Sequence, residues 1–308
     1  METSQDKYTY HTPVMLQECL EGLNISPDGI YVDVTFGGGG HSRAIFEKLS
    51  EKGKLIVFDQ DGDAAKNAWT APNFHFIASN FSYLKNQLRL LGIKYVDGIL
   101  GDLGVSSYQF NQPERGFSIR SNEHLDMRMN QRQEKSAFQV INEYDEADLL
   151  KIFAKYGEVQ NPRKIAQTIC LNRQANPIST TGELVELLKS FAPRNQENKF
   201  LAQIFQAIRI EVNDELIVLE KMLEQTAEML RPNGRLVIMS YHSLEDRLVK
   251  NFMKRGSFDG EIEKDFYGNV LKPFTELNRK PIIPSDLEIE QNPRARSAKL
   301  RIATRNEG

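Results

Sequence analysis

Cysteine is scarce in this sequence, and its scarcity excludes several classes of protein. Only Cys19 and Cys170 occur in 308 residues, far apart and in segments of helical pattern. Two such cysteines provide neither a disulfide framework nor the ligand spacing of a metal site. We therefore expect both to pack as buried apolar side chains, and we expect no bound metal ion.

Long apolar runs and an excess of positive charge are also missing. No run approaches the roughly 20 apolar residues that span a bilayer. The opening METSQDKYTYHTP lacks the basic start and apolar centre of a signal peptide. We therefore expect a cytoplasmic protein with no membrane partner. The formal net charge of −3 argues against a wholly basic nucleic-acid binder, so RNA contacts would need local patches.

Short apolar runs alternate with helical patterns through the first third of the chain. A helix is expected to begin at Thr12 as N-cap and Pro13 as first helical residue. Strands are expected at residues 29–35, 54–59, 74–79 and 95–104, with helical segments between them. This alternation predicts right-handed crossovers and a parallel sheet, in which ligands bind at the carboxyl ends of the strands.

The alternation stops near residue 105. Residues 105–133 show no sustained period, although their apolar side chains favour packing over disorder. Helices without strands follow, near residues 136–143, 145–156, 161–173, 181–191 and 198–230. The last part returns to a strand at 234–240, a helix at 243–255 capped by Ser243, and a half-buried strand at 296–305. This order predicts an α/β domain that carries an inserted helical domain.

Four consecutive glycines, Gly37–Gly40, follow the first expected strand. A phosphate-binding P-loop needs lysine after the last glycine, where this chain has His41. A dinucleotide fingerprint needs glycine where this chain has Ser42. Asp33 before the run and Asp59 after the next strand instead match the cofactor motif of S-adenosylmethionine-dependent methyltransferases. There, bare backbone approaches the cofactor and the second acid accepts hydrogen bonds from ribose. A turn without ligand is the alternative.

Other strand ends carry further candidates. Phe81 is placed to stack on adenine or, alternatively, to staple the next helix. Asp102 is placed to contact the cofactor or a substrate amine, or else to serve the fold. Tyr241 and His242 are placed to hold an unstacked base, whereas the simpler role for His242 is at the helix entry. Residues 292–305 hold five basic residues and no acid, which indicates a phosphate-contacting strip or a charged edge strand.

Segments along nearly the whole chain together resemble the bacterial small-subunit ribosomal RNA cytosine-N4 methyltransferases. They are HTPVMLQECLEGL, VDVTFGGGGHS, FDQD, GDLGVSSYQ, ERGFS, LDMRMN, FQAIRIEVNDEL, SYHSLEDRLVK and NPRARSAKLR. The resemblance implies S-adenosylmethionine-dependent N4-methylation of a cytidine in the decoding region of 16S rRNA, on the small ribosomal subunit. It also implies a Rossmann-like class I methyltransferase domain, residues 1–108 and 212–308, with residues 109–211 as an inserted helical domain that recognises substrate.

The resemblance also implies roles for individual residues. The implied cofactor contacts are Gly39, Gly40, His41, Asp59, Phe81, Asp102 and Gln109. Asp102 and His242 are the candidate catalytic residues, Asp102 as acceptor of the amine proton. Val34 stands where the family has glycine, and its side chain is expected to point into the sheet. The D-P-P-Y motif of many amino-group methyltransferases is missing after the fourth strand, where Asp102 precedes Leu103.

Several expectations and alternatives remain open from the sequence. Arg115, Arg120 and Arg128 are expected to clamp RNA together with the helical insert. Methylation at a ring carbon would need a cysteine nucleophile, and neither cysteine is expected near a strand end. A nicotinamide-dependent dehydrogenase and a non-catalytic ribosome-binding module are the competing functions. The sequence leaves open whether the protein is a homodimer.

Overall fold

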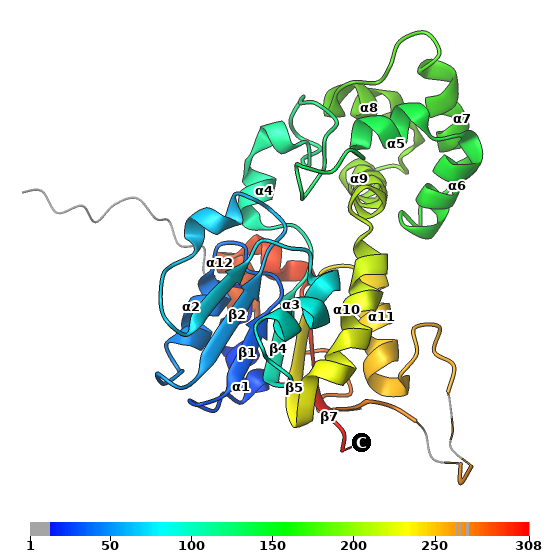
Figure 1. The fold of residues 1–308 in the computed structure, drawn as a ribbon. Coiled ribbons are helices and arrows are strands. Elements are labelled where there is room, and N and C mark those ends of the chain that lie inside the picture. Colours follow the sequence, from blue (N-terminus) through cyan, green and yellow to red (C-terminus); the bar gives the residue numbers. More distant parts are fainter. Residues whose placement is uncertain (1–12, 263, 265, 269–270, 308) are drawn as a thin grey trace, which may run out of the picture. The chain divides into compact units, whose positions relative to one another are not determined.

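The computed structural model describes residues 13–262, 264, 266–268 and 271–307, in which the chain forms two compact units. The first unit consists of Met1–Gly104 and Val218–Gly308, and the second of Val105–Ile217. Figure 1 shows the α/β unit in blue, cyan, yellow and red, and the helical unit in green. Each unit has a hydrophobic core of its own.

A mostly parallel sheet forms the centre of the first unit. Its strands are β1 (Ile30–Asp33), β2 (Lys54–Phe58), β3 (Phe74–Ile77), β4 (Val96–Asp102), β5 (Leu230–Ser240), β6 (Phe274–Glu276) and β7 (Lys299–Arg305). The strand order is β3-β2-β1-β4-β5-β7-β6. Strands β1 to β5 pair in parallel in the Rossmann order, and β7 is antiparallel to both neighbours. The Rossmann-like methyltransferase fold predicted from the sequence is confirmed.

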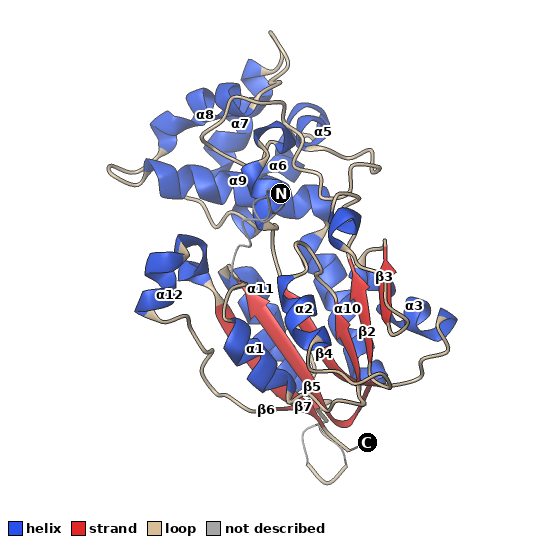
Figure 2. Cartoon of the chain, turned by 90° about the vertical axis from the view of Figure 1, so that its left-hand side faces the viewer, coloured by secondary structure: helices blue, strands red, loops and turns tan. Residues whose placement is uncertain are grey.

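Helices cover both faces of this sheet. Successive side chains of a strand point to opposite faces, so apolar side chains on both faces need a cover. Leu55 and Val57 of β2 pack in the core beneath α1 and α2, which lie in front of the sheet in Figure 2. Ile56 and Phe58 pack on the opposite face, in the core that includes residues of α3, α10 and α11. The helices of the chain are α1 (Leu16–Leu23), α2 (Gly40–Phe46), α3 (Leu84–Leu90), α4 (Ser107–Asn111), α5 (Ala137–Glu143), α6 (Glu146–Lys155), α7 (Pro162–Asn172), α8 (Thr181–Leu188), α9 (Glu197–Asn213), α10 (Glu215–Met229), α11 (Ser243–Arg255) and α12 (Asp286–Gln291). Among the described residues, no helix has the length and apolar character needed to cross a membrane.

The first helix begins later than the sequence predicts. Helix α1 starts at Leu16, and Met15 before it has a left-handed backbone with φ of 50°. The Met15 N–H donates to Glu288 Oε1 at 2.6 Å, so this residue is tied to the C-terminal part of the chain. Thr12, the expected cap, lies outside the described residues.

The second unit packs the irregular segment 105–133 into its core. Phe117, Leu125, Met127 and Met129 are buried among side chains of the surrounding helices. The prediction that this segment packs is therefore confirmed. Apart from α4 and a 3-10 turn at Pro113–Arg115, the segment is irregular, and it keeps a defined path because its backbone groups find partners inside the unit.

The prediction of one long helix at 198–230 is wrong, because the helix is interrupted at Asp214. This residue has φ of 50°, so α9 ends at Asn213 and α10 begins at Glu215. The buried Asn213 amide explains the position of the break. It donates to the Met127 carbonyl at 2.8 Å and accepts the Met129 N–H at 2.7 Å, and thereby holds the irregular segment.

Two of the three arginines expected to clamp RNA hold this segment instead. Arg115 is 2% exposed and donates from Nη2 to the carbonyls of Arg128 and Met129. The Arg128 guanidinium pairs with both carboxylate oxygens of Asp126, at 2.7 and 2.9 Å. These engaged groups do not support an RNA contact, whereas Arg120 is exposed.

The basic strip at 292–305 is also partly structural. Strand β7 lies between β5 and β6 and is therefore no edge strand. Arg301 is 5% exposed and donates to Asp246 Oδ1 at 2.6 Å. Arg305 donates to the carbonyls of Ala227 and Pro273. In the exposed part of the strip before β7, which includes Arg296, a phosphate contact stays a prediction.

Candidate functional site

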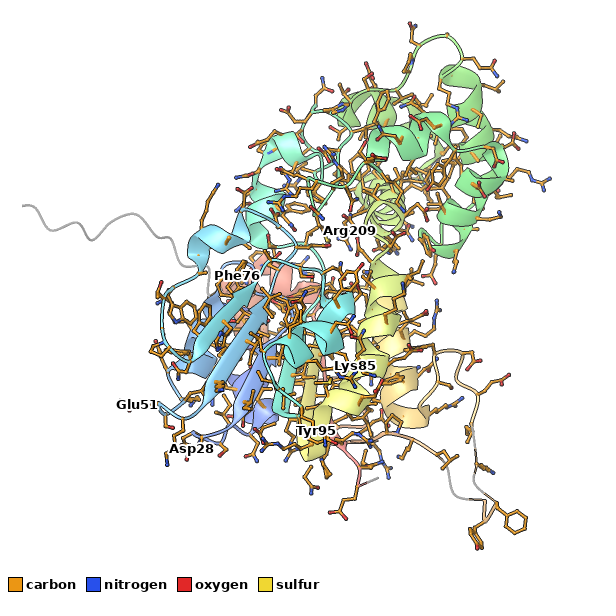
Figure 3. All side chains as sticks on the ribbon, viewed as in Figure 1. Asp28, Glu51, Phe76, Lys85, Tyr95 and Arg209 are labelled. Carbon is orange, nitrogen blue, oxygen red and sulfur yellow. The ribbon has the colours of Figure 1, made fainter. Side chains whose placement is uncertain are left out.

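The candidate site lies at the carboxyl ends of the parallel strands. Figure 3 labels Asp28 and Glu51 near the edge where β1 and β2 begin, and Phe76 toward the opposite edge, where the strands end. Asp33 and Asp102 are the last residues of β1 and β4. Polar side chains from different parts of the first unit thus meet at one edge, as the parallel sheet predicts.

The glycine run forms the turn between β1 and α2. Gly37 and Gly39 have positive φ, 50° and 77°, which favours glycine at both positions. A Cβ on Gly40 would lie 2.4 Å from Pro13 Cγ. Glycine is therefore needed at position 40 because the Pro13 ring packs directly against its backbone. A Cβ on Gly38 would meet no atom within 4 Å. The open side of the turn is therefore at Gly38.

Asp33, the last residue of β1, holds this turn through hydrogen bonds to residues on both sides of the glycines. It is 1% exposed, and its carboxylate accepts the Thr35 N–H at 3.0 Å and the Ser42 hydroxyl at 2.6 Å. Thr35 in turn accepts the Asp102 N–H through Oγ1 at 2.7 Å. Thr35 and Ser42 were not among the predicted site residues, although both flank the glycines in sequence. Val34 is buried in the core as predicted.

Asp59 closes the other side of the turn. Its Oδ2 accepts the Gly37 N–H and its Oδ1 accepts the Asp61 N–H, both at 2.8 Å. Burial raises the pKa of Asp59 to about 6, against the effect of these two hydrogen bonds. A carboxylate fixed in this way at the end of the second strand is suited to accept hydrogen bonds from ribose hydroxyls.

Asp102 is held by side chains rather than by backbone. The Tyr241 hydroxyl donates to Oδ1 at 2.8 Å, and His41 Nδ1 lies 3.8 Å from Oδ2. Burial raises the pKa of Asp102 to about 6, although His41 and Tyr241 lower it. Burial and the Asp102 charge raise the pKa of Tyr241, so its hydroxyl stays protonated and serves as a donor. Tyr241 was expected to hold a base, and its contact with Asp102 was missed.

His41 is buried at the start of α2, in the first unit. Its Nε2 lies 3.0 Å from the Val14 carbonyl oxygen, while Nδ1 faces Asp102. The sequence placed His41 in the cofactor loop, and the structure adds its contact with the candidate catalytic carboxylate.

His242 occupies the N-cap of α11, a position predicted for Ser243. Its Nδ1 accepts the Glu245 N–H at 3.4 Å. Its Nε2 lies 3.1 Å from Glu245 Oε1 without hydrogen-bond geometry, and Glu245 Oε2 accepts the Tyr241 N–H at 3.0 Å. The arrangement supports a helix-capping role, and a role for His242 in catalysis stays a prediction.

Cys19 lies closer to the site than its sequence position predicts. Burial raises the pKa of its thiol well above the usual value, and the Asp102 charge is the next cause. The expectation that neither cysteine is near a strand end is therefore wrong for Cys19. Because the thiol is fully buried and protonated, it is unsuited to nucleophilic attack.

The remaining predicted contacts have structural partners of their own. Phe81 begins a 3-10 turn, Phe81–Tyr83, and packs against the core beneath α3. Gln109 belongs to the second unit, where its side chain and Ser106 form a capping box on α4. Contacts of Phe81 and Gln109 with a cofactor stay predictions.

Comparison with known proteins adds independent findings. The model of the MraW methylase family matches residues 8–306. A protein of Christiangramia forsetii called ribosomal RNA small subunit methyltransferase H is 57% identical over 294 residues, covering 96% of this chain and 97% of that one. The protein of the same name from Flavobacterium johnsoniae is 56% identical, with the same shares covered. A solved structure from Clostridium thermocellum, described as a putative rRNA-methylase, is 11% identical, with a TM-score of 0.45 over 94% of this chain and 95% of that one.

Proposed function

Because this chain belongs to the MraW methylase family, we propose that it methylates the N4 amine of a cytidine in the decoding region of 16S rRNA, on the small ribosomal subunit. The chain is a methyltransferase, and its cofactor is S-adenosylmethionine. This membership decides against the nicotinamide-dependent dehydrogenase. The names of the relatives support small-subunit rRNA as the substrate class.

The cofactor suits the residues at the strand ends. S-adenosylmethionine carries a sulfonium and an ammonium charge, and the edge of the sheet offers the carboxylates of Asp59 and Asp102. The turn exposes bare backbone at Gly38, where no neighbouring atom lies within 4 Å of an added Cβ. We assign ribose binding to Asp59, adenine contact to Phe81, and further cofactor contacts to the loop backbone at Gly39, Gly40 and His41 and to Gln109.

The observation that carries the proposal for an amine substrate is the carboxylate of Asp102. Cytosine N4 is conjugated with the ring and is a weak nucleophile, so transfer requires a proton acceptor and in-line alignment within about 3–3.5 Å. Asp102 Oδ1 accepts the Tyr241 hydroxyl, and Oδ2 points toward His41 at a distance too long for a hydrogen bond. Oδ2 is therefore the proposed acceptor of the amine proton.

Carbon methylation is disfavoured by the same site. Methylation at ring carbon 5 would require a thiolate adduct at the neighbouring carbon, which makes carbon 5 nucleophilic enough to attack the cofactor methyl group. The cysteine beside the site, Cys19, is buried and protonated. An exocyclic amine needs no such adduct, but its base must be unstacked to reach the site.

The test is methyl transfer to small subunits from a strain that lacks this protein. Purified protein and S-adenosylmethionine with a labelled methyl group should label 16S rRNA, and digestion to nucleosides should yield N4-methylated cytidine. A different modified nucleoside would contradict the proposed atom. Absence of transfer to such subunits would favour the non-catalytic ribosome-binding alternative.

A further inference from the structure

The His41–Asp102 pair has a feature that cofactor binding does not require. Asp102 Oδ1 is taken by the Tyr241 hydroxyl, and Oδ2 faces the imidazole of His41, with 3.8 Å between Oδ2 and Nδ1. The His41 side chain is 9% exposed and that of Asp102 is 25% exposed. The carboxylate is therefore open on one side, while the imidazole is enclosed behind it.

The tautomer of His41 follows from its second contact. Nε2 lies 3.0 Å from the Val14 carbonyl, and a carbonyl oxygen only accepts hydrogen bonds. Nε2 must therefore carry a hydrogen, and in the neutral imidazole Nδ1 has a lone pair. That lone pair faces a carboxylate oxygen. Two acceptors that face each other beside a partly exposed carboxylate repel unless one proton lies between them, so the geometry favours uptake of one proton by the pair.

We propose that Asp102 Oδ2 and His41 Nδ1 form a two-step proton relay for methyl transfer, a role that rests on the proposed function. The N4 lone pair forms the new bond to the methyl carbon while the carbon–sulfur bond breaks and its electron pair stays on sulfur. The N4 proton passes to Asp102 Oδ2 and then to His41 Nδ1. The products are methylated cytidine, S-adenosylhomocysteine and an imidazolium that later returns its proton to solvent.

The surroundings favour the second step. The imidazolium would keep the hydrogen bond from Nε2 to the Val14 carbonyl and would regain an ionised Asp102 beside Nδ1. The 3.8 Å gap must close to hydrogen-bond length, by side-chain adjustment or through one water molecule. Other titratable groups that act on Asp102 are Asp33 of β1, Glu245 of α11 and Tyr241. Cys19 of α1 also lies near it.

A purely structural role for His41 makes a different prediction. If the imidazole only anchors the segment at Val14, a glutamine with its amide N–H in place of Nε2–H should preserve function. His41→Gln keeps a donor for the carbonyl and lacks a basic nitrogen. His75→Gln is the matched control. It is the same substitution, and His75 lies on β3, outside the described site.

The experiment measures single-turnover methyl transfer to unmethylated small subunits at saturating S-adenosylmethionine, with the KM for S-adenosylmethionine and the Kd for S-adenosylhomocysteine. We expect His41→Gln to lower the transfer rate about 100-fold while KM and Kd stay within threefold of wild type. His75→Gln should match wild type. A His41→Gln rate within threefold of wild type, or a loss confined to KM and Kd, overturns the relay alone. Absence of transfer by wild type overturns the proposed function and the relay with it.

A measurement on the wild-type protein keeps the test independent of how well the variant folds. Nitrogen NMR of histidine-labelled protein reports which ring nitrogen carries hydrogen. We expect His41 to show a protonated Nε2 and an unprotonated Nδ1 in the free protein at pH 8. The opposite tautomer would remove the acceptor and overturn the relay.

Discussion

Asp59 and Asp102 lie at the carboxyl ends of two parallel strands of one sheet, and burial raises the pKa of each to about 6, yet their surroundings differ. Both Asp59 oxygens accept backbone N–H groups, from Gly37 and Asp61. The Asp102 oxygens face two side chains, a tyrosine hydroxyl and an imidazole. A carboxylate fixed by backbone shapes a binding loop, whereas one held by ionisable side chains is suited to exchange protons.

The largest effect is expected from Asp102→Asn. The amide still accepts the Tyr241 hydroxyl but cannot take up the amine proton, so the methyl-transfer rate should fall about 10³-fold. Binding of S-adenosylhomocysteine, measured by calorimetry, should change less than tenfold. Asp97→Asn is the matched control, since Asp97 lies on the same strand about 16 Å from Asp102. Near-normal turnover by Asp102→Asn would remove this carboxylate from the mechanism.

The loop that Asp59 closes offers a second contrast, between two glycines separated by one residue, Gly38 and Gly40. Gly40→Ala places its Cβ against Pro13 Cγ and should lower the free energy of unfolding by about 2 kcal/mol. Gly38→Ala meets open space and should change it by less than about 0.5 kcal/mol. Urea denaturation of the two variants checks this. Equal losses for both would contradict the open space beside Gly38.

Asp59→Asn should affect binding more than chemistry. The carboxylate accepts two backbone N–H groups, from Gly37 and Asp61, but the amide NH₂ can accept neither, so one of these hydrogen bonds is lost. The neutral amide also forms weaker hydrogen bonds with ribose hydroxyls than the carboxylate does. We expect the Kd for S-adenosylhomocysteine to rise about tenfold, which is about 1.4 kcal/mol. The transfer rate at saturating cofactor should fall less than tenfold. If this rate fell as far as in Asp102→Asn, the contrast between the two carboxylates would be lost.

The smallest effect concerns stability and pH. Because the pKa of Asp102 is raised to about 6 in the folded protein, ionising it opposes folding. The contribution of Asp102 to the free energy of unfolding is fully present below its ordinary pKa near 4, and it is lost as pH rises through 6. Asp102→Asn should therefore be more stable than wild type at pH 8 by about 1 kcal/mol, a value reduced for partial exposure. This advantage should disappear by pH 4 in thermal melts, and a constant difference across pH would contradict it.

The strands and the edge that carries the acids were predictable, because alternation and parallel pairing depend on local pattern. Arg301 was misassigned to an exposed strip, since its pairing with Asp246 depends on how α11 packs over β7. The break at Asp214 was missed for a similar reason. It depends on hydrogen bonds from Asn213 to a segment more than 80 residues earlier in the chain.

The side-chain contacts of the site were beyond sequence reasoning. Tyr241 follows β5 and His41 lies in the first turn of α2, and nothing local indicates that both reach the same carboxylate. Such contacts depend on rotamers chosen by tertiary packing. The sequence could therefore name Asp102 as a candidate, but it could not show which of its oxygens is open.

The insertion of residues 105–217 between two neighbouring strands has a consequence for the order of folding. Pairing β4 with β5 brings Asp102 opposite Met239 and closes a long loop, and such non-local pairing slows folding. The inserted segment has its own core and leaves the ribosome before β5 does. Tyr241 follows β5, so its hydrogen bond to Asp102 forms late. A nascent chain can therefore complete its proton acceptor only after β5 and Tyr241 have been synthesised.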